Sequence, residues 1–239
     1  MQETQIQKSQ KPKSWYKRWW AIVLFVISGI ILLIAPLFIY QTYKVYQEIK
    51  TGTFFSMSVL ADQAPYDMEL LLDDFSPSLG SENAKVQVIE FGDFNCPLCQ
   101  QSSITFRLLM NQYSDQVKFY WRNYPVVSPS SIDLAVTGIC ANKQDKFWQY
   151  HDYLFNNQSL IDPNNLKGLA AASGLNMVEY EKCMNNKMTS AQILKDNYAA
   201  ADGEVRGTPT FFINGYKVEG VVPHEVWQKI IDAFLAEYE

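Results

Sequence analysis

Apolar and polar positions divide the 239-residue chain into a long apolar segment near its N-terminus and a patterned remainder. No side chain is charged from residue 19 to residue 40, and about 20 apolar residues suffice to cross a bilayer. Trp and Tyr side chains flank this segment at both ends, as they do at the two interfaces of membrane-spanning helices. The pattern therefore predicts a transmembrane helix over residues 19–40, after a basic segment at 1–18.

Charge asymmetry across the apolar segment predicts its orientation. The first 20 residues carry five Lys and Arg side chains against Glu3 alone, which favours a cytoplasmic N-terminus and places the body of the protein outside. A cleaved signal peptide is the alternative, but its apolar region is usually about 7 to 15 residues long and ends at a small-residue cleavage site. Residues 36–41 offer no such site, so we expect a retained anchor, with residues 41–65 continuing the helix before forming a tether.

The remainder of the chain alternates between strand and helix patterns. Apolar residues alternate over 85–91 and again over 116–122, whereas 101–113 has the apolar spacing of one helix face. A strand, a helix and a second strand in this order predict a βαβ unit with a right-handed crossover. Upstream, residues 68–72 are interpreted as an edge strand, and the Ser, Pro and Gly residues of 76–83 as a turn.

A helical block and a final β-hairpin complete the pattern. Five helical segments are predicted at 132–141, 147–155, 166–172, 178–184 and 190–200. Strand patterns return at 210–213 and 216–219, and the Asn-Gly pair between them is a strong hairpin signal. A last helix is expected over 225–238.

Composition and charge narrow the classes of function. The chain is 48% hydrophobic, with 14 Phe, 14 Tyr and 6 Trp, which is enough to build a core without disulfide staples. Because the whole chain carries −5 and its first 20 residues +4, the remainder carries −9. An acidic body without a basic stripe argues against nucleic acid as a partner.

Two of the four cysteines stand three residues apart where a strand pattern gives way to a helix. Cys96 is expected at the N-cap of that helix and Pro97 in the first helical position, where its missing N–H costs nothing. A thiol at a helix N-terminus lies near the positive end of the helix dipole and near free N–H groups, which favour the thiolate. Cys96 is therefore the predicted nucleophile, and Cys99, shielded one turn into the helix, the resolving thiol.

A zinc half-site completed by Cys140 and Cys183 is an alternative for this pair. Such a site needs a second local pair of ligands, and those two cysteines lie 43 residues apart, so we expect no metal. In an oxidising compartment Cys140 and Cys183 are expected to form a structural disulfide, which contributes roughly 3 to 4 kcal/mol by closing a loop of this length. Two buried free thiols remain the alternative, because spacing does not fix the connectivity.

Glu90 lies six residues before Cys96, in a strand that should be central to a sheet. A buried carboxyl group there would have a raised pKa and could accept the proton of Cys99 during thiol-disulfide exchange. An edge-exposed glutamate without a role is the alternative. His151 and His224 are interpreted as helix-surface or capping residues without a catalytic role, and the sequon Asn157-Gln158-Ser159 is a weak signal.

Four segments occur in an order that is informative about the family. They are the strand and Cys-x-x-Cys helix start at 88–99, the aromatic segment 147–155, the Gly-Thr-Pro-Thr stretch with its hairpin at 207–215, and the terminal helix. Together they resemble the DsbA-like thiol-disulfide oxidoreductases, especially the membrane-anchored ones of bacteria. The resemblance covers about residues 75–239 and implies an α/β, thioredoxin-like domain over 66–239 with a helical insertion at about 128–203.

The resemblance also implies how the site works. The bond before Pro209 should be cis, and Thr208 should present its backbone to the substrate peptide beside Cys96. Pro97 and Leu98 would also contact substrate, and because they lack the imidazole found between the cysteines of the best-known DsbA, we expect a milder oxidant. An oxidase needs re-oxidation, which implies a membrane quinone reductase of the DsbB or vitamin K epoxide reductase (VKOR) type.

These observations predict a single-pass cell-membrane protein whose extracytoplasmic domain donates disulfides to reduced secreted or cell-surface proteins, without a cofactor. An envelope reductase or isomerase is the alternative within the same enzyme class. From another class, an anchored metal-delivery module would use Cys96 and Cys99 as ligands, but such a carrier would be expected to add a nearby His or Met.

Overall fold

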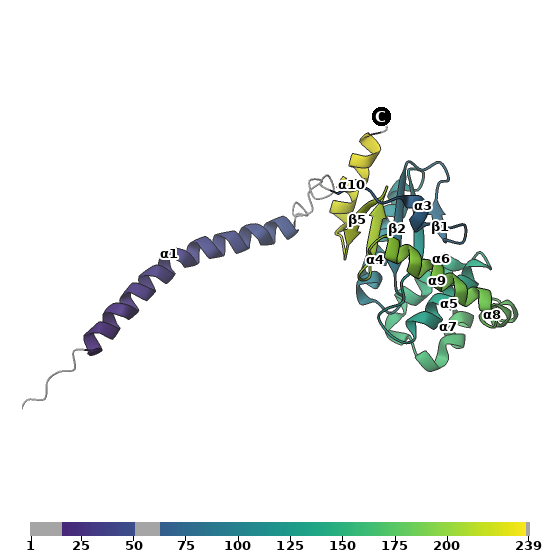
Figure 1. The fold of residues 1–239 in the computed structure, drawn as a ribbon, viewed down its shortest axis with the longest axis horizontal. Coiled ribbons are helices and arrows are strands. Elements are labelled where there is room, and N and C mark those ends of the chain that lie inside the picture. Colours follow the sequence, from purple (N-terminus) through teal and green to yellow (C-terminus); the bar gives the residue numbers. More distant parts are fainter. Residues whose placement is uncertain (1–15, 51–62, 238–239) are drawn as a thin grey trace, which may run out of the picture. The chain divides into compact units, whose positions relative to one another are not determined.

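The computed structural model describes residues 16–50 and 63–237, and the chain divides into two compact units, 1–54 and 55–239. The first unit contains one long helix, α1 (Tyr16–Lys50), with Pro36 inside it (Figure 1). Its segment Trp19–Gln47 is long and apolar enough to cross a membrane and has no buried side chain among the described residues. Residues 1–15 of the predicted basic segment 1–18 and residues 51–62 of the predicted tether 41–65 lie outside the described residues.

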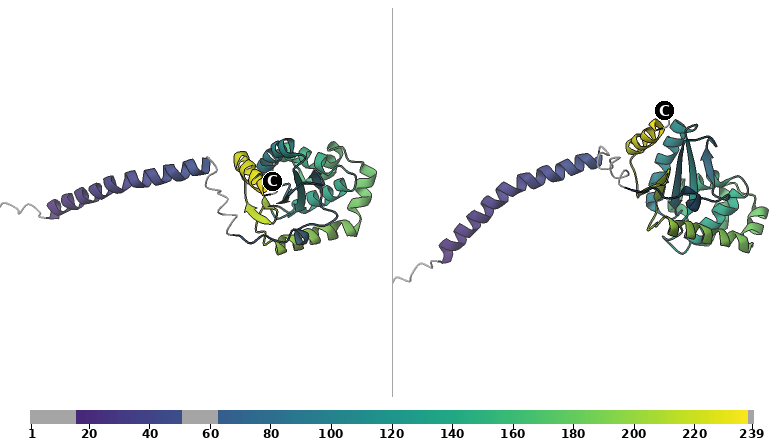
Figure 2. Two further views of the ribbon diagram at one scale, coloured as in Figure 1. Left: turned by 90° about the horizontal axis from the view of Figure 1, so that it is seen from above. Right: turned by 45° about the horizontal axis from the view of Figure 1, so that its top comes forward.

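A five-stranded mixed sheet forms the centre of the second unit (Figures 1 and 2). Its strands are β1 (Ser78–Gly80), β2 (Val86–Gly92), β3 (Val117–Asn123), β4 (Thr210–Ile213) and β5 (Tyr216–Glu219). The strand order is β1-β3-β2-β4-β5, in which only β2 and β3 run parallel. Helix α4 (Pro97–Tyr113) connects these two strands, so the predicted βαβ unit is present.

Successive side chains of β2 point to opposite faces of the sheet, and they are buried on both. Val86 and Val88 pack in the cluster formed with α4 and α10 (His224–Ala236). Ile89 and Phe91 belong to a cluster on the opposite face, where α3 (Met68–Leu71) and α9 (Lys187–Asp202) contribute side chains. Glu90 has the same parity as Val88, so it faces the α4 side of the sheet.

The block between β3 and β4 is helical, and its helices gather at one end of the sheet (Figures 1 and 2). Its elements are α5 (Ser131–Asn142), α6 (Phe147–Asn156), the 3-10 turns η1 (Gln158–Leu160) and η2 (Pro163–Asn165), α7 (Leu166–Ala172), α8 (Met177–Met184) and α9. We call this block the helical insertion. Both of its ends return to the sheet, through the loop after β3 and the loop before β4.

Two local predictions are wrong. The expected edge strand at 68–72 is helix α3, because the side chain of Asp67 caps it by accepting the N–H of Glu69 at 2.9 Å. The edge strand is instead β1, inside the stretch interpreted as a turn. Gly80 permits this pairing, since its φ is +112° and a Cβ atom there would lie 2.2 Å from the oxygen of Val117. The last helix ends at Ala236 in the described part of the chain, so its predicted end at Tyr238 is not described.

Candidate active site

Strand β2 leads directly into the paired cysteines. It ends at Gly92, where a Cβ atom would lie 2.2 Å from the Trp121 ring, so only glycine lets the indole pack over the strand end. Cys96 follows in extended backbone, with φ −78° and ψ 119°, at the N-cap of α4. Pro97 occupies the first helical position. The thiol of Cys96 therefore stands beside the free N–H groups of the first turn.

The loop after β3 holds one flank of the turn between β2 and α4. Asp93 is 2% exposed, and its carboxylate accepts the N–H of Asn95 at 2.8 Å and those of Val126 and Val127 at 2.9 and 2.8 Å. The side-chain amide of Asn95 donates to the hydroxyl of Ser128 at 2.8 Å. These bonds tie the turn to the start of the helical insertion.

The segment after α6 holds the other flank. The amide nitrogen of Gln158 donates to the backbone oxygens of Phe94 and Cys96, each at 2.9 Å. In return, the amide of Gln100 on α4 donates to the backbone oxygen of Phe155 at 2.7 Å. The helical insertion therefore binds the turn on two flanks, at Asn95 and through Gln158, whereas Gln100 joins α4 to the end of α6.

The two thiols of this site differ sharply in acidity. Cys96 is 5% exposed, Cys99 is fully buried, and both are reduced. A hydrogen bond from Cys99 lowers the pKa of Cys96 to about 5 against the opposing effect of burial, and the Thr208 side chain and the N–H groups of Cys99 and Leu98 add to this. Burial, the bond to Cys96 and the charge of Glu90 raise the pKa of Cys99 well above its ordinary value. At neutral pH the pair is thus a thiolate and a thiol.

Glu90 is buried on the α4 face of the sheet, where it interacts electrostatically with both cysteines. Its strand neighbours are Trp121 on β3 and Phe211 on β4, both buried. Its Oε1 atom has no hydrogen-bond partner among the described residues. Burial, followed by the nearby charge of Cys96, raises the pKa of Glu90 to about 8. The carboxyl group can therefore exchange a proton near neutral pH.

The loop before β4 supplies the far wall of the site. The peptide bond between Thr208 and Pro209 is cis, and the Thr208 backbone oxygen lies 3.3 Å from the Cys96 sulfur, where it accepts the S–H of the protonated thiol. The next residue, Thr210, pairs with Phe91 in the sheet, and the oxygen of Pro209 accepts the N–H of Gly220 at 2.9 Å. Sheet register thus fixes the loop beside Cys96.

Exposed apolar side chains follow Cys96 in the sequence and occupy the loop that is bound to its turn. Leu98 is 48% exposed and Pro97 is also exposed, immediately after Cys96. Val126 and Val127 are 54% and 47% exposed, and their backbone is bound to the turn by Asp93. A polypeptide reaching Cys96 would meet these side chains.

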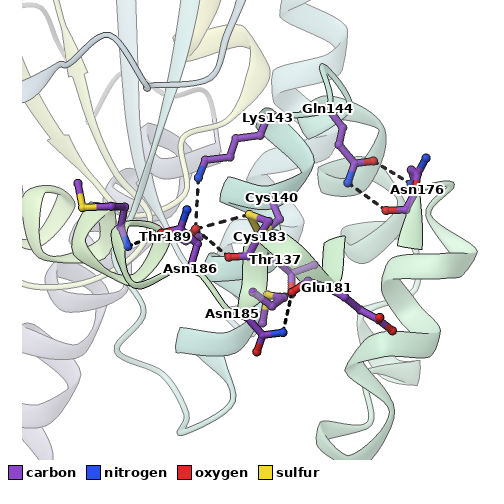
Figure 3. The surroundings of a disulfide bond; sticks show 12 residues. Thr137, Cys140, Lys143, Gln144, Asn176, Glu181, Cys183, Asn185, Asn186 and Thr189 are labelled. Atoms are coloured by element: carbon purple, nitrogen blue, oxygen red, sulfur yellow. Dashed lines mark hydrogen bonds between the residues drawn. A yellow bond between two sulfur atoms is a disulfide. The ribbon is translucent and has the colours of Figure 1, made fainter. Parts of the chain in front are cut away.

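The other two cysteines are bonded to each other in the helical insertion (Figure 3). The disulfide joins Cys140 on α5 to Cys183 on α8, with Cα atoms 5.7 Å apart. Thr189 lies 3.6 Å from the Cys183 sulfur and accepts a hydrogen bond from Lys143 at 3.2 Å. In this arrangement the two cysteines do not complete a zinc site with Cys96 and Cys99. No group of three His, Cys, Asp or Glu side chains that could hold a metal lies within the described residues.

Both histidines lie outside the site, but His151 is not on a helix surface as expected. It is 1% exposed within the aromatic cluster of Phe94, Trp121 and Phe155. Burial lowers its pKa, although the Asp152 carboxylate, which accepts a hydrogen bond from the ring at 3.0 Å, opposes this. His224 is the first residue of α10.

Three residues of the site were missed by sequence reasoning. Asp93 and Asn95 adjoin the cysteines, and their type as turn formers was the only available signal. Gln158 lies 62 residues after Cys96, and nothing in its local sequence connects it with the thiols.

The comparisons with known proteins agree with this geometry. A family model described as thioredoxin matches residues 73–233, well over half of the chain. A probable disulfide bond formation protein D of Bacillus cereus is 29% identical over 179 residues, covering 70% of this chain and 82% of that relative. The crystal structure of oxidised BdbD from Bacillus subtilis superposes with a TM-score of 0.62 at 23% identity, over 72% of this chain and 97% of that one.

Another relative matches this chain over a small part of its own length. The Na(+)/H(+) antiporter NhaA 1 of Salinispora arenicola is 32% identical over 143 residues, which are 59% of this chain and 22% of the antiporter. The chain thus spans about a fifth of the length of such relatives.

The predicted thioredoxin-like fold with a helical insertion is confirmed. The chain belongs to the thioredoxin family.

Proposed function

We propose that this protein is a membrane-anchored oxidase that donates the Cys96–Cys99 disulfide to the thiols of secreted or cell-surface proteins. The single observation that carries the proposal is the contrast between the two thiols, an acidic Cys96 beside a buried, protonated Cys99. A low pKa of the nucleophile stabilises the reduced pair and therefore makes the disulfide a stronger oxidant.

Disulfide donation proceeds in two exchanges. A substrate thiolate attacks the sulfur of Cys96, the Cys96–Cys99 bond breaks, and Cys99 leaves with the electron pair. A second substrate thiolate then attacks the substrate sulfur of the mixed disulfide, and Cys96 leaves as a stable thiolate. Two electrons pass from the substrate thiols to the protein, and the substrate gains a disulfide.

Glu90 supplies and removes the proton of the buried thiol. With a pKa of about 8 the carboxyl group is mostly neutral at pH 7, so it can protonate Cys99 as that sulfur leaves. When the protein is re-oxidised, the carboxylate takes this proton back, which frees Cys99 to attack the mixed disulfide formed on Cys96. Burial keeps water away from this exchange, so a nearby carboxyl group is needed.

Substrate binding falls to the surface around Cys96. The backbone of Thr208 beside Pro209 and the exposed side chains of Pro97 and Leu98 are in reach of an extended polypeptide. The apolar character of Leu98 favours unfolded segments over polar folded surfaces, because unfolded chains expose apolar side chains.

Helix α1 supports an anchor at the cell membrane, and the basic residues before it favour a cytoplasmic N-terminus with the catalytic unit outside. An extracytoplasmic location agrees with the disulfide between Cys140 and Cys183, since such bonds persist in oxidising compartments. Re-oxidation requires a two-electron acceptor, for which we propose a DsbB-like or VKOR-like quinone reductase in the same membrane.

Disulfide formation in a reduced, unfolded substrate tests the activity. The full chain in detergent micelles, oxidised beforehand, should form disulfides stoichiometrically, and Cys96→Ser should abolish this. The contrary result is a wild type that neither oxidises this substrate nor reduces insulin, with a Cys96→Ser variant that changes only in metal content. That result would contradict the proposed enzyme activity and support a metal-delivery module.

The reduction potential of the Cys96–Cys99 pair tests the direction of electron flow. A disulfide donor should have a potential well above that of thioredoxin, which is about −270 mV. A value near the thioredoxin potential would contradict donation and support an envelope reductase or isomerase.

A further inference from the structure

Gln158 contacts the turn that carries the nucleophile, although it belongs to the helical insertion. It is half-buried at the start of η1, directly after α6. One nitrogen, Nε2, donates to two backbone oxygens at 2.9 Å, those of Phe94 and Cys96. The two hydrogens of a single amide group therefore bridge the residues on either side of Asn95.

The bond to the Cys96 oxygen is not needed to satisfy that atom. The same oxygen already accepts the N–H of Gln100 at 3.1 Å, which is the first hydrogen bond of α4. The second donor, the Gln158 amide, instead affects the charge and the orientation of the Cys96 carbonyl group. It draws negative charge from the carbonyl group of Cys96 itself, and it fixes the orientation of that peptide plane.

Orientation matters here because the thiolate depends on backbone donors. The N–H groups of Leu98 and Cys99 bond the Cys96 sulfur, and they follow the peptide plane that Gln158 holds. On the opposite flank, the Asn95 amide donates to Ser128 at 2.8 Å. Gln158 and Asn95 thus restrain the turn from both sides, as a rigid site requires.

We propose that Gln158 is a positioning residue for thiol-disulfide exchange, which holds the Phe94 and Cys96 carbonyl groups and so keeps the Cys96 sulfur against the N–H groups of Leu98 and Cys99. This inference rests on the proposed function, because it assigns Gln158 to the same reaction. Gln158 does not touch the reacting atoms and acts only through the turn.

The effect of Gln158 should fall on the reduced state. Reduced Cys96 carries a negative charge that the oriented N–H groups stabilise, whereas the disulfide form carries none. Loss of the amide should therefore raise the pKa of Cys96 and make the disulfide a weaker oxidant. A tenfold change in the equilibrium constant corresponds to about 30 mV for this two-electron couple.

Gln158→Leu in the full chain, in detergent micelles, tests the inference. We expect the pKa of Cys96, measured from thiolate absorbance, to rise by about half to one unit. The equilibrium constant with glutathione should shift by about 3- to 10-fold toward the disulfide form, which is at most about 30 mV. Gln100→Leu is the matched control, because it removes an equivalent amide bond to Phe155 and leaves the turn carbonyl groups in place.

The outcomes separate a positioning role from a structural one. If Gln158→Leu loses stability but keeps the wild-type pKa and potential, or if Gln100→Leu shifts both equally, the inference is overturned. Gln158→Glu provides a second variant of the same shape should Gln158→Leu not fold. Its carboxylate cannot donate, so it should raise the pKa of Cys96 at least as much as leucine does.

The measurement also distinguishes this inference from the proposed function. The acidity of Cys96 can be measured whether or not the wild type oxidises substrates. An inactive wild type would overturn the proposed function, while an unchanged pKa in both Gln158 variants would overturn the role of Gln158 alone.

Discussion

Two buried carboxyl groups lie on opposite faces of the central sheet in contrasting surroundings. Glu90 on β2 faces α4, between Trp121 and Phe211, and its Oε1 atom has no hydrogen-bond partner among the described residues. Asp196 on α9 meets the other face, where it accepts from the Arg122 guanidinium at 3.1 Å and from the Asn123 amide at 2.7 Å. Both carboxyl groups are at most 4% exposed.

The two carboxyl groups differ in whether a buried cation compensates their charge. Arg122 is 2% exposed and also pairs with Asp73 at 3.1 Å, so a buried cation holds two carboxylates and joins α9 to the sheet. Burial raises the pKa of Asp196, and Arg122 and the Asn123 amide oppose that rise. No cation among the described residues pairs with Glu90, and its pKa rises to about 8. A paired carboxylate stabilises the fold, whereas an unpaired one is available for proton transfer.

Removal of the cation should have the largest effect. Arg122→Met leaves the buried carboxylate of Asp196 and the half-buried one of Asp73 without their cation, and we expect the free energy of unfolding, measured with urea, to fall by about 3–5 kcal/mol. The double variant Arg122→Met/Asp196→Asn should recover part of this loss, since fewer charges remain unpaired. A loss below about 1 kcal/mol in the single variant would show that the ion pairs do not hold α9 to the sheet.

Removal of the disulfide should lower the stability nearly as much as removal of Arg122. The disulfide lies in the helical insertion, so neither face of the central sheet is altered. We expect Cys140→Ser/Cys183→Ser to lower the free energy of unfolding by roughly 3 to 4 kcal/mol, because the loop of 43 residues is no longer closed. The pKa of Cys96 should stay unchanged. This variant therefore separates loss of stability from loss of chemistry, and a shifted pKa would contradict that separation.

Replacement of Glu90 should slow the exchange instead. In Glu90→Gln the buried Cys99 loses its proton acceptor, and we expect re-oxidation by a small-molecule disulfide to slow by about 10²-fold in stopped-flow fluorescence. Asp196→Asn is the matched control, since it changes a buried carboxyl group on the opposite face. Equal rates in the two variants would exclude a role for Glu90 in proton transfer.

The smallest predicted effect is a change in how stability depends on pH. The pKa of Glu90 rises from 4.5 in the unfolded chain to about 8, so the folded state binds more protons and its stability is lost as pH rises through this window. In the reduced protein, where Cys96 titrates equally in wild type and variant, Glu90→Gln should remove about 2 kcal/mol of this loss between about pH 5 and pH 7. Parallel pH curves for wild type and variant would mean that Glu90 titrates normally.

Local patterns anticipated much of the fold and part of the site. The βαβ unit around the cysteines and the hairpin after Pro209 were predictable because each depends on neighbouring residues. The edge strand was misplaced, since β1 has only three residues and depends on pairing with β3. His151 was misplaced because the helical pattern does not reveal how many aromatic rings surround one face.

The sequence by itself determined the long apolar segment near the N-terminus, the order of elements, and the position of Cys96 at a strand-to-helix junction, because these follow from hydrophobic period and from turn and cap chemistry. Only the tertiary structure decided which partners act on that junction. Gln158 and Thr208 reach Cys96 from 62 and 112 residues away, and Asp196 reaches Asn123 from 73. Burial and pairing of this kind set the acidity of each group, and they exist only once distant segments pack together.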